Sequence, residues 1–247
     1  MIDIHSHFLY GLDDGAETIE DSLAMLQMAA ESGTTDIVAT PHANSDYPFQ
    51  PDLIRQRIAE ITAAPGVKPR LHTGCDFHLS FENVQDALQN PTRYVINRGP
   101  YLLVEFPHSS LAGMGRSLAA LLDLGLVPIM THPERNPHLR RMGSEFQEWI
   151  QKGCLVQVTA QSLFGSFGKS AEQSAWEMVR RRLAHFIASD AHDTEHRPPC
   201  LNLAFDAVSA RVGAAEARAL AIDNPQAVIS GDPIWATLPR KKRWYQW

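Results

Sequence analysis

Residues 1–7, MIDIHSH, place His5 at the end of a short apolar run and His7 two residues later. Side chains two residues apart on a β-strand point to the same face, so both imidazoles can reach one ion. Further short runs follow along the chain, most of them rich in Val, Ile, Leu and Ala. Such runs are typical of strands buried on both faces of a parallel sheet. The predicted strands are residues 2–7, 36–40, 70–74, 101–106, 127–131, 154–158 and 185–189.

Helical stretches separate these strands along the chain. We predict helices at residues 17–32, 52–63, 115–124, 144–152, 169–183, 201–211 and 214–222. Strands that alternate with helices, without a linker between them, predict a single α/β domain over residues 1–247. The expected architecture is a barrel of seven parallel strands with helices outside, and a doubly wound open sheet is the alternative.

Composition restricts the classes of function. The 247 residues carry a net charge of -6, which argues against broad attraction to nucleic acids or anionic membranes. The three cysteines, Cys75, Cys154 and Cys200, have no regular spacing, which suits a cytoplasmic protein rather than a disulfide framework. We expect no secretory signal and no membrane insertion. The basic and aromatic residues 239–247 are expected to pack or fray at the surface.

Metal-ligand residue types follow almost every predicted strand. In a parallel barrel the carboxyl ends of all strands face the same side, so these side chains would meet in one pocket. Singly, a buried His is more often a hydrogen-bonded core residue, and Asp14 or Asp190 could be a helix N-cap. The joint pattern favours a centre of Zn, Mn or Fe with more than one ion. The candidate ligands are His5, His7, Asp14, His42, Asp76, Glu105, His132, Asp190 and His192.

Other phosphoester chemistries fit the sequence poorly. A cysteine phosphatase needs an Arg six residues after its Cys, but Phe81, Ala160 and Asp206 occupy those positions. The segment 165–170, GSFGKS, ends like a phosphate-binding P-loop, but Leu163 stands where that motif needs Gly. Two metal ions can stabilise both the attacking and the leaving oxygen of a phosphoester. We therefore expect a metal-dependent phosphoester hydrolase.

Several motifs resemble one known family. They are MIDIHSHFLYGLDDGA at the start, ATPH (39–42), GCD (74–76), VEFP (104–107), THPERN (131–136) and ASDAHDTEHRPP (188–199). Together they resemble the PHP superfamily, and within it the bacterial protein-tyrosine phosphatases encoded with capsule and exopolysaccharide genes. The resemblance covers roughly residues 1–225 and implies a distorted seven-stranded barrel that holds three divalent ions, Mn or Fe, with Zn as an alternative.

The resemblance also assigns the ligands to sites. One site would use His5, His7, Asp76 and Asp190. A second would share Asp76 and add Glu105 and His132. The third would use Asp14, His42 and His192. The family commonly has Glu where this chain has Asp76, whose side chain is one methylene shorter.

The family further implies a mechanism. Arg135 and Arg197 would grip the phosphate, because the planar guanidinium can bind two of its oxygens at once. We expect a metal-activated hydroxide to attack phosphorus in line. Our own hypothesis for the proton donor to the leaving group is His42 or His192, whichever is not fully ligated. No nucleic acid is expected to bind.

The implied substrate is a phosphotyrosine protein, namely a membrane-associated tyrosine autokinase that controls polysaccharide export. The alternatives are a small-molecule phosphatase, such as one acting on histidinol phosphate, and a metal-binding regulatory domain without turnover. The oligomeric state cannot be derived from these motifs.

Overall fold

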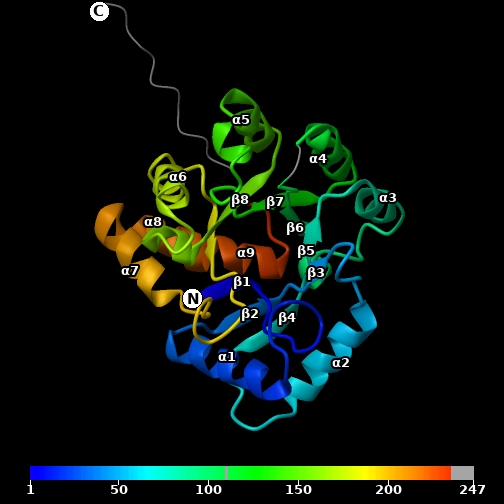
Figure 1. Ribbon diagram of the computed structural model, residues 1–247, viewed down its shortest axis with the longest axis vertical. Coiled ribbons are helices and arrows are strands. Elements are labelled where there is room, and N and C mark those ends of the chain that lie inside the picture. The colour runs from blue at the N-terminus through cyan, green and yellow to red at the C-terminus, as the bar shows by residue number, and fades with distance from the viewer. Residues whose placement is uncertain (109–110, 235–247) are drawn as a thin grey trace, which may run out of the picture.

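Parallel strands form the centre of the molecule, with helices around them (Figure 1). This computed structural model describes residues 1–108 and 111–234, so the expectation for residues 239–247 falls outside the described residues. The described strands are β1 (Ile2–Ser6), β2 (Asp36–Ala39), β3 (His42–Ala43), β4 (Arg70–Thr73), β5 (Asp76–His78), β6 (Tyr101–Glu105), β7 (Val127–Thr131), β8 (Leu155–Thr159) and β9 (Phe186–Ala188).

These strands form two sheets. The first has the order β1-β2-β4 and the second the order β3-β5-β6-β7-β8-β9, and every pair within them is parallel. An isolated parallel bridge joins Ser6 at the end of β1 to Ala191, just after β9. The α/β class and the parallel pairing that we predicted are therefore confirmed, whereas a closed seven-stranded barrel is not.

The two strands that the sequence did not predict, β3 and β5, each begin two residues after the end of a predicted strand. After β2 the chain passes through Pro41, which has no N–H to donate, and resumes as β3. After β4 it passes through Gly74, where an added Cβ would lie only 3.0 Å from side-chain atoms of Ile96 and Val38. Backbone hydrogen bonds from Gly74 to Ala39 and from Asp76 to Pro41 keep the two segments paired across the break. Each interruption directly precedes a candidate ligand, His42 or Asp76.

Helices follow the strands along most of the chain. The helix α1 begins with a capping box, in which Thr18 and Asp21 each accept a hydrogen bond from the other's backbone N–H. The α-helices are α1 (Ile19–Glu31), α2 (Pro51–Thr62), α3 (Phe81–Gln89), α4 (Met114–Asp123), α5 (Ser144–Gln151), α6 (Lys169–Arg180), α7 (Asn202–Arg211), α8 (Ala214–Arg218) and α9 (Asn224–Ser230). Shorter turns are η1 (Ile96–Arg98), η2 (Leu139–Arg141), η3 (Ala160–Phe164) and the π-helical η4 (Ala219–Asp223).

The sequence did not predict all of these helices. It missed α3, and it gave one helix over 214–222 where α8, η4 and α9 follow one another. No helix in the described ranges is long and apolar enough to cross a membrane.

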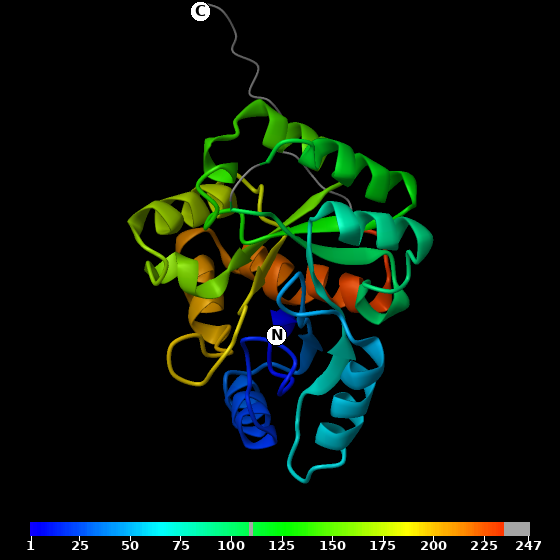
Figure 2. The same cartoon turned by 45° about the vertical axis from the view of Figure 1, so that its right-hand side comes forward.

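Most strands are buried on both faces, as continuous apolar runs require, whereas the edge strand β4 is partly exposed. In β6, Tyr101 and Leu103 belong to one apolar cluster, while Leu102 and Val104 belong to another. Val228 of α9 completes the first cluster, and Figures 1 and 2 show this helix beside the central strands. Apolar side chains therefore fill the space between the strands away from their carboxyl ends, and charged groups occupy those ends.

Burial of His185 makes the stability of this fold depend on pH. Its side chain is 7% exposed, and its Nδ1 accepts a hydrogen bond from the Val156 N–H at 3.1 Å. Burial lowers the pKa of His185 to about 4. The unfolded chain therefore binds an extra proton below pH about 6.5, so this residue's contribution to stability is present above that pH and is lost toward pH 4.

We predict that His185→Gln, which keeps a neutral acceptor, flattens the acid side of the stability profile. Relative to the wild type, the free energy of unfolding should change by up to about 3 kcal/mol less between pH 7 and pH 4. Urea titrations at several pH values measure this difference, and groups that titrate elsewhere cancel between the two proteins. Parallel profiles for the two proteins would contradict the prediction.

Candidate metal centre

The candidate ligands lie at or just beyond the carboxyl ends of the parallel strands. His5 lies in β1, and His42 and Asp76 begin β3 and β5. Glu105 ends β6, and His132 follows β7 directly. The remaining candidates come from loops after β1 and β9, and they are His7, Asp14, Asp190 and His192. Because the strands run parallel, these positions all lie at one edge of the sheets.

The structure brings all nine of these side chains together. Their ligand atoms form overlapping groups within 4.8 Å, and no other His, Cys, Asp or Glu of the described residues joins such a group. The groups are His5, His7 and Asp190; His5, Asp76 and His132; His42, Asp76 and Glu105; and His7, Asp14, His42 and His192.

The partition expected from the family differs in detail from these groups. His7 lies near the Asp14 group as well as near Asp190, and His42 lies near Asp76 and Glu105 as well as near Asp14. A residue shared between neighbouring groups is expected where several ions lie close together, because one ligand can then face two of them.

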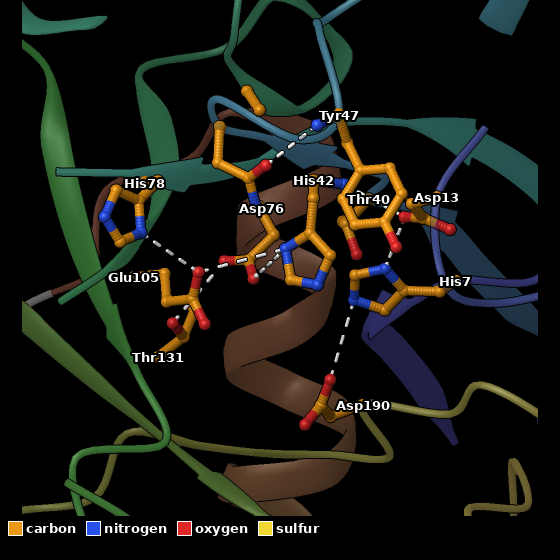
Figure 3. Close-up of polar contacts among 12 residues, drawn as sticks. His7, Asp13, Thr40, His42, Tyr47, Asp76, His78, Glu105, Thr131 and Asp190 are labelled. Carbon is orange, nitrogen blue, oxygen red and sulfur yellow. Dashed lines mark hydrogen bonds and ion pairs between the residues drawn. The ribbon is translucent and has the colours of Figure 1, made fainter. Parts of the chain in front are cut away.

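Asp76 occupies the middle of the centre. It is fully buried, and its Oδ2 lies 3.2 Å from His42 Nδ1, as Figure 3 shows. The same oxygen lies 3.6 Å from His5 Nε2. Its Oδ1 accepts a long hydrogen bond of 3.5 Å from the Thr131 hydroxyl. The neighbouring Glu105 carboxylate faces two rings: its Oε2 lies 3.9 Å from His42 Nδ1, and its Oε1 lies 3.9 Å from His132 Nε2. Although it is shorter than Glu, Asp76 therefore faces ligands of two groups.

Asp190 faces two kinds of partner with its two oxygens. Oδ1 lies 3.4 Å from His5 Nε2 and 3.6 Å from His7 Nε2. Oδ2 accepts hydrogen bonds from Arg135 and Arg197, the latter at 2.6 Å. The two arginines predicted to grip phosphate thus lie directly beside the candidate ligands. Asp190 therefore contacts both the histidines of the centre and the two arginines.

The third set of residues is more open to solvent. Asp14 is half-exposed, and its Oδ1 lies 3.4 Å from both His42 Nε2 and His192 Nε2. The two histidines are buried or nearly so. Asp14 therefore lies at the edge of the centre that is open to solvent.

The charges within the centre shift the pKa values of its groups. Burial lowers the pKa of His7, but the Asp13 carboxylate 2.6 Å from Nδ1 outweighs burial and raises it to about 9. Burial likewise lowers the pKa of His42, but Asp14 and Asp76 raise it to about 11. Burial raises the pKa of Asp76, yet His5 and His42 hold it well below its usual range. The carboxylates are thus ionised, and the negative charge that favours protons here also favours cations.

Unpartnered polar atoms test whether the residues fit metal ions. Buried polar side-chain atoms in proteins are nearly always hydrogen-bonded. In the described residues, His42 Nδ1, Asp76 Oδ2 and His192 Nε2 are buried and make no hydrogen bond. In addition, His5 Nε2 and His7 Nε2 face each other at 3.2 Å, where they can share at most one proton. These lone pairs and carboxylates suit divalent cations bound by nitrogen and oxygen.

Two candidate ligands have a strained backbone. His132 has φ 35° and Asp190 has φ 53°, both in the left-handed region that residues other than Gly rarely adopt. Such conformations cost about 1–3 kcal/mol each and are concentrated at functional sites. The fold therefore sacrifices some stability to hold these two side chains in place.

The structure adds supporting residues that the sequence analysis did not include among the ligands. Asp13 accepts hydrogen bonds from His7 Nδ1, from the His42 backbone at 3.0 Å and from the Gly15 backbone at 3.0 Å. Gln157 on β8 accepts a hydrogen bond from His5 Nδ1 at 3.0 Å. Both contacts orient an imidazole so that its Nε2 faces the centre. The two consecutive aspartates of DDG could have indicated Asp13. A single Gln within an apolar strand gave no signal for Gln157.

A further histidine also lies beside the centre. His78 Nδ1 is 3.3 Å from Glu105 Oε2, although the sequence gave His78 no role as a ligand (Figure 3). It joins none of the groups. Its contact orients the Glu105 carboxylate.

Comparison with known proteins identifies close relatives. Residues 1–230 match the family model described as capsular polysaccharide synthesis, CpsB/CapC. The chain is 31% identical to the putative tyrosine-protein phosphatase CapC of Staphylococcus aureus, over 99% of each chain. It is 34% identical to the tyrosine-protein phosphatase YwqE of Bacillus subtilis strain 168, over 80% of this chain and 79% of YwqE.

A solved structure has the same fold. It comes from crystallographic work on YwqE of Bacillus subtilis and CpsB of Streptococcus pneumoniae, described as unique metal-dependent tyrosine phosphatases. The TM-score is 0.89 at 28% identity, and the match covers 97% of this chain and 98% of the other.

Gly15 provides a test of the loop that carries Asp14. A Cβ added at this position would lie 2.0 Å from the backbone oxygen of His7 and 2.6 Å from its Cβ. We predict that Gly15→Ala displaces either His7 or the loop at Asp13 and Asp14. The variant should bind less metal per chain, measured by elemental analysis, and should lose about 1–3 kcal/mol of unfolding free energy.

Gly143→Ala is the matched control. Gly143 has φ -81°, and an added Cβ would meet nothing within 4 Å. Because Gly143 is the N-cap residue of α5, Ala can lower stability there, but the variant should keep wild-type metal content. Wild-type metal content in Gly15→Ala would show that the close approach to His7 is unimportant for the centre.

Proposed function

The chain belongs to the capsular polysaccharide synthesis CpsB/CapC family, and we propose that it is a metal-dependent protein-tyrosine phosphatase. The observation that carries this proposal is the arrangement at Asp190. One of its oxygens faces His5 and His7, and the other accepts from Arg135 and Arg197. A phosphate held by the arginines would therefore lie next to the candidate cation sites. The resemblance noted in the sequence motifs agrees with this family.

The residues of the centre would hold three divalent cations, for which we propose Mn or Fe, with Zn as an alternative. The overlapping groups of ligand atoms support more than one ion. Divalent cations bound there would lower the pKa of water and supply the nucleophile at neutral pH. Asp13 and Gln157 would fix the ring orientations of His7 and His5.

The arginines would bind and stabilise the transferred phosphoryl group. Arg135 and Arg197 are each about one-fifth to one-quarter exposed, at 21% and 24%, so their charges are only partly screened by solvent. Their positive charge would offset the negative charge on the equatorial oxygens during in-line displacement. A tyrosine leaving group has a pKa of about 10, so the demand for a proton donor is modest. We assign that secondary role to His42 or His192, whichever of the two is not bound to a cation.

The proposed substrate is a phosphotyrosine protein, namely a membrane-associated bacterial tyrosine kinase that regulates capsule or exopolysaccharide synthesis. The names of the relatives support the reaction, and the family description supports the connection with capsule. We place the reaction in the cytoplasm, because Cys75, Cys154 and Cys200 are all free.

We also propose that the two sheets belong to one distorted barrel within a single domain. The hydrogen bonds across the breaks near Pro41 and Gly74 support this arrangement, as does the Ser6–Ala191 bridge. Such a barrel would explain why ligands from nearly every strand reach one cavity.

Removal of metal is the direct test of the proposed function. We predict that a strong chelator, followed by gel filtration, abolishes hydrolysis of an aryl phosphate and of a phosphotyrosine peptide. Added Mn²⁺ or Fe²⁺ should restore both activities, with elemental analysis giving the number of ions per chain. Turnover by the fully metal-free protein would contradict the mechanism.

The same preparations distinguish the alternatives. A regulatory domain without turnover would remain inactive when loaded with metal. A small-molecule phosphatase would have a higher kcat/KM for histidinol phosphate than for the phosphotyrosine peptide, and this outcome would contradict a protein substrate.

Substitution of Arg135 tests the proposed phosphate grip. We predict that Arg135→Ala lowers kcat/KM for aryl phosphates about 100-fold or more, because one charged donor to the transition state is lost. Arg181→Ala is the control, because Arg181 is half-exposed and pairs with Glu177 on α6. That variant should keep wild-type kinetics. Unchanged kinetics in Arg135→Ala would remove its assigned role.

A further inference from the structure

The loop between η3 and α6 carries an aromatic side chain to the two arginines. Gly165 and Gly168 have φ values of 79° and 88°, which Gly adopts without the strain that other residues would have. These glycines allow the chain to turn sharply on both sides of Phe167. This segment belongs to GSFGKS, which did not fit a P-loop.

Phe167 covers the guanidinium groups. The Arg135 Cζ lies 4.2 Å from the centroid of the Phe167 ring, and the Arg197 Cζ lies 6.0 Å from it. A cation within about 6 Å of a ring face is attracted by the negative potential of the ring. One partly buried aromatic ring therefore contacts both of the charges proposed to bind phosphate.

The remaining contacts leave donors available on these arginines. Both guanidiniums donate to Asp190 Oδ2, which fixes one edge of each group. The Nε of Arg197 is buried and has no hydrogen-bond partner in the part of the chain that the structure describes. A carboxylate at one edge and a ring at the face thus orient the arginines without using all their N–H groups.

A buried carboxylate connects the Phe167 loop to the segment that carries Arg135. Glu134 is fully buried, and its Oε1 accepts hydrogen bonds from the Thr159 backbone at 3.0 Å and the Ser162 hydroxyl at 2.7 Å. Thr159 precedes η3 and Ser162 lies within it, and Phe167 follows three residues after the end of η3. The positions of Arg135 and Phe167 are therefore fixed relative to each other.

We propose that Phe167 is a positioning residue that holds Arg135 and Arg197 in the orientation required to bind the phosphate of the substrate. This inference rests on the proposed phosphatase function. Phe167 acts through the arginines and takes no part in bond making. Without the ring, the guanidiniums would keep the edge contact to Asp190 but could rotate about it.

The test compares Phe167→Leu, Phe167→Tyr and a control. Leu retains an apolar side chain without a π face, whereas Tyr retains the π face. Phe164→Leu is the control, because Phe164 lies at the end of η3, is 51% exposed and has no such arginine contact among those described. Metal content and unfolding free energy are measured for each variant, so that misfolded protein is recognised.

The kinetic readouts are KM and kcat for an aryl phosphate and the inhibition constant of inorganic phosphate. Phe167→Leu should raise KM and the phosphate inhibition constant about threefold to thirtyfold, with a smaller change in kcat. Phe167→Tyr and Phe164→Leu should stay close to the wild type. In an Arg135→Ala background, the effect of Phe167→Leu should be much smaller, because its main partner is absent.

Two outcomes would overturn the assignment of Phe167 while leaving the phosphatase function intact. One is wild-type phosphate inhibition in Phe167→Leu, alongside the loss of activity in Arg135→Ala. The other is an equal loss in the Leu and Tyr variants, which would indicate general packing rather than a cation–π contact. If the metal-loaded wild type neither hydrolyses the aryl phosphate nor binds inorganic phosphate, the proposed function is wrong and this inference fails with it.

Discussion

The structure depends on charge balance within a buried cluster of imidazoles and carboxylates at the carboxyl ends of the strands. Asp76 and His5 are fully buried, and Asp190 is nearly so. Burying isolated charges is very unfavourable, so each must face an opposite charge, a proton or a cation. Asp3 is also fully buried, and it accepts hydrogen bonds from the backbone N–H groups of His5 and Ser189. The parallel strands supply the rigid frame that keeps so many polar groups together.

The candidate ligands and the two arginines occupy different parts of the fold. The imidazoles and carboxylates lie at or just beyond the carboxyl ends of the strands, where most of them are buried. Arg135, Arg197 and Phe167 come from loops, and the two arginines are partly exposed, as the proposed binding of phosphate requires. Most of the candidate ligands thus lie in a strand or directly after one, whereas loops carry the two arginines that we propose for phosphate binding, and loops on a rigid scaffold commonly carry the functional groups of enzymes with this architecture.

The sequence predicted which side chains lie together at the strand ends, because their signals are local and repeated. His5 lies in β1, His7 follows it two residues later, and most later candidates come directly after an apolar run, so the parallel topology brings them together. The short strands β3 and β5 were missed because they begin with ligands, His42 and Asp76, and contain too few apolar residues to form a pattern. Gln157, Glu134 and Phe167 were missed for a different reason. Their roles arise from tertiary contacts that no local pattern encodes. Gln157 contacts His5, 152 residues away in the sequence, and Glu134 contacts Ser162, 28 residues away.

The shared position of Asp190 has a thermodynamic consequence. One carboxylate faces the histidines through Oδ1 and the arginines through Oδ2, so any change in its charge or position acts on both sides. By thermodynamic linkage, a bound cation that strengthens phosphate binding by a given free energy must itself bind more strongly by the same free energy when phosphate is present. Occupancy of the centre and saturation with oxyanions are therefore reciprocal variables, and a dissociation constant for either is defined only at a stated concentration of the other.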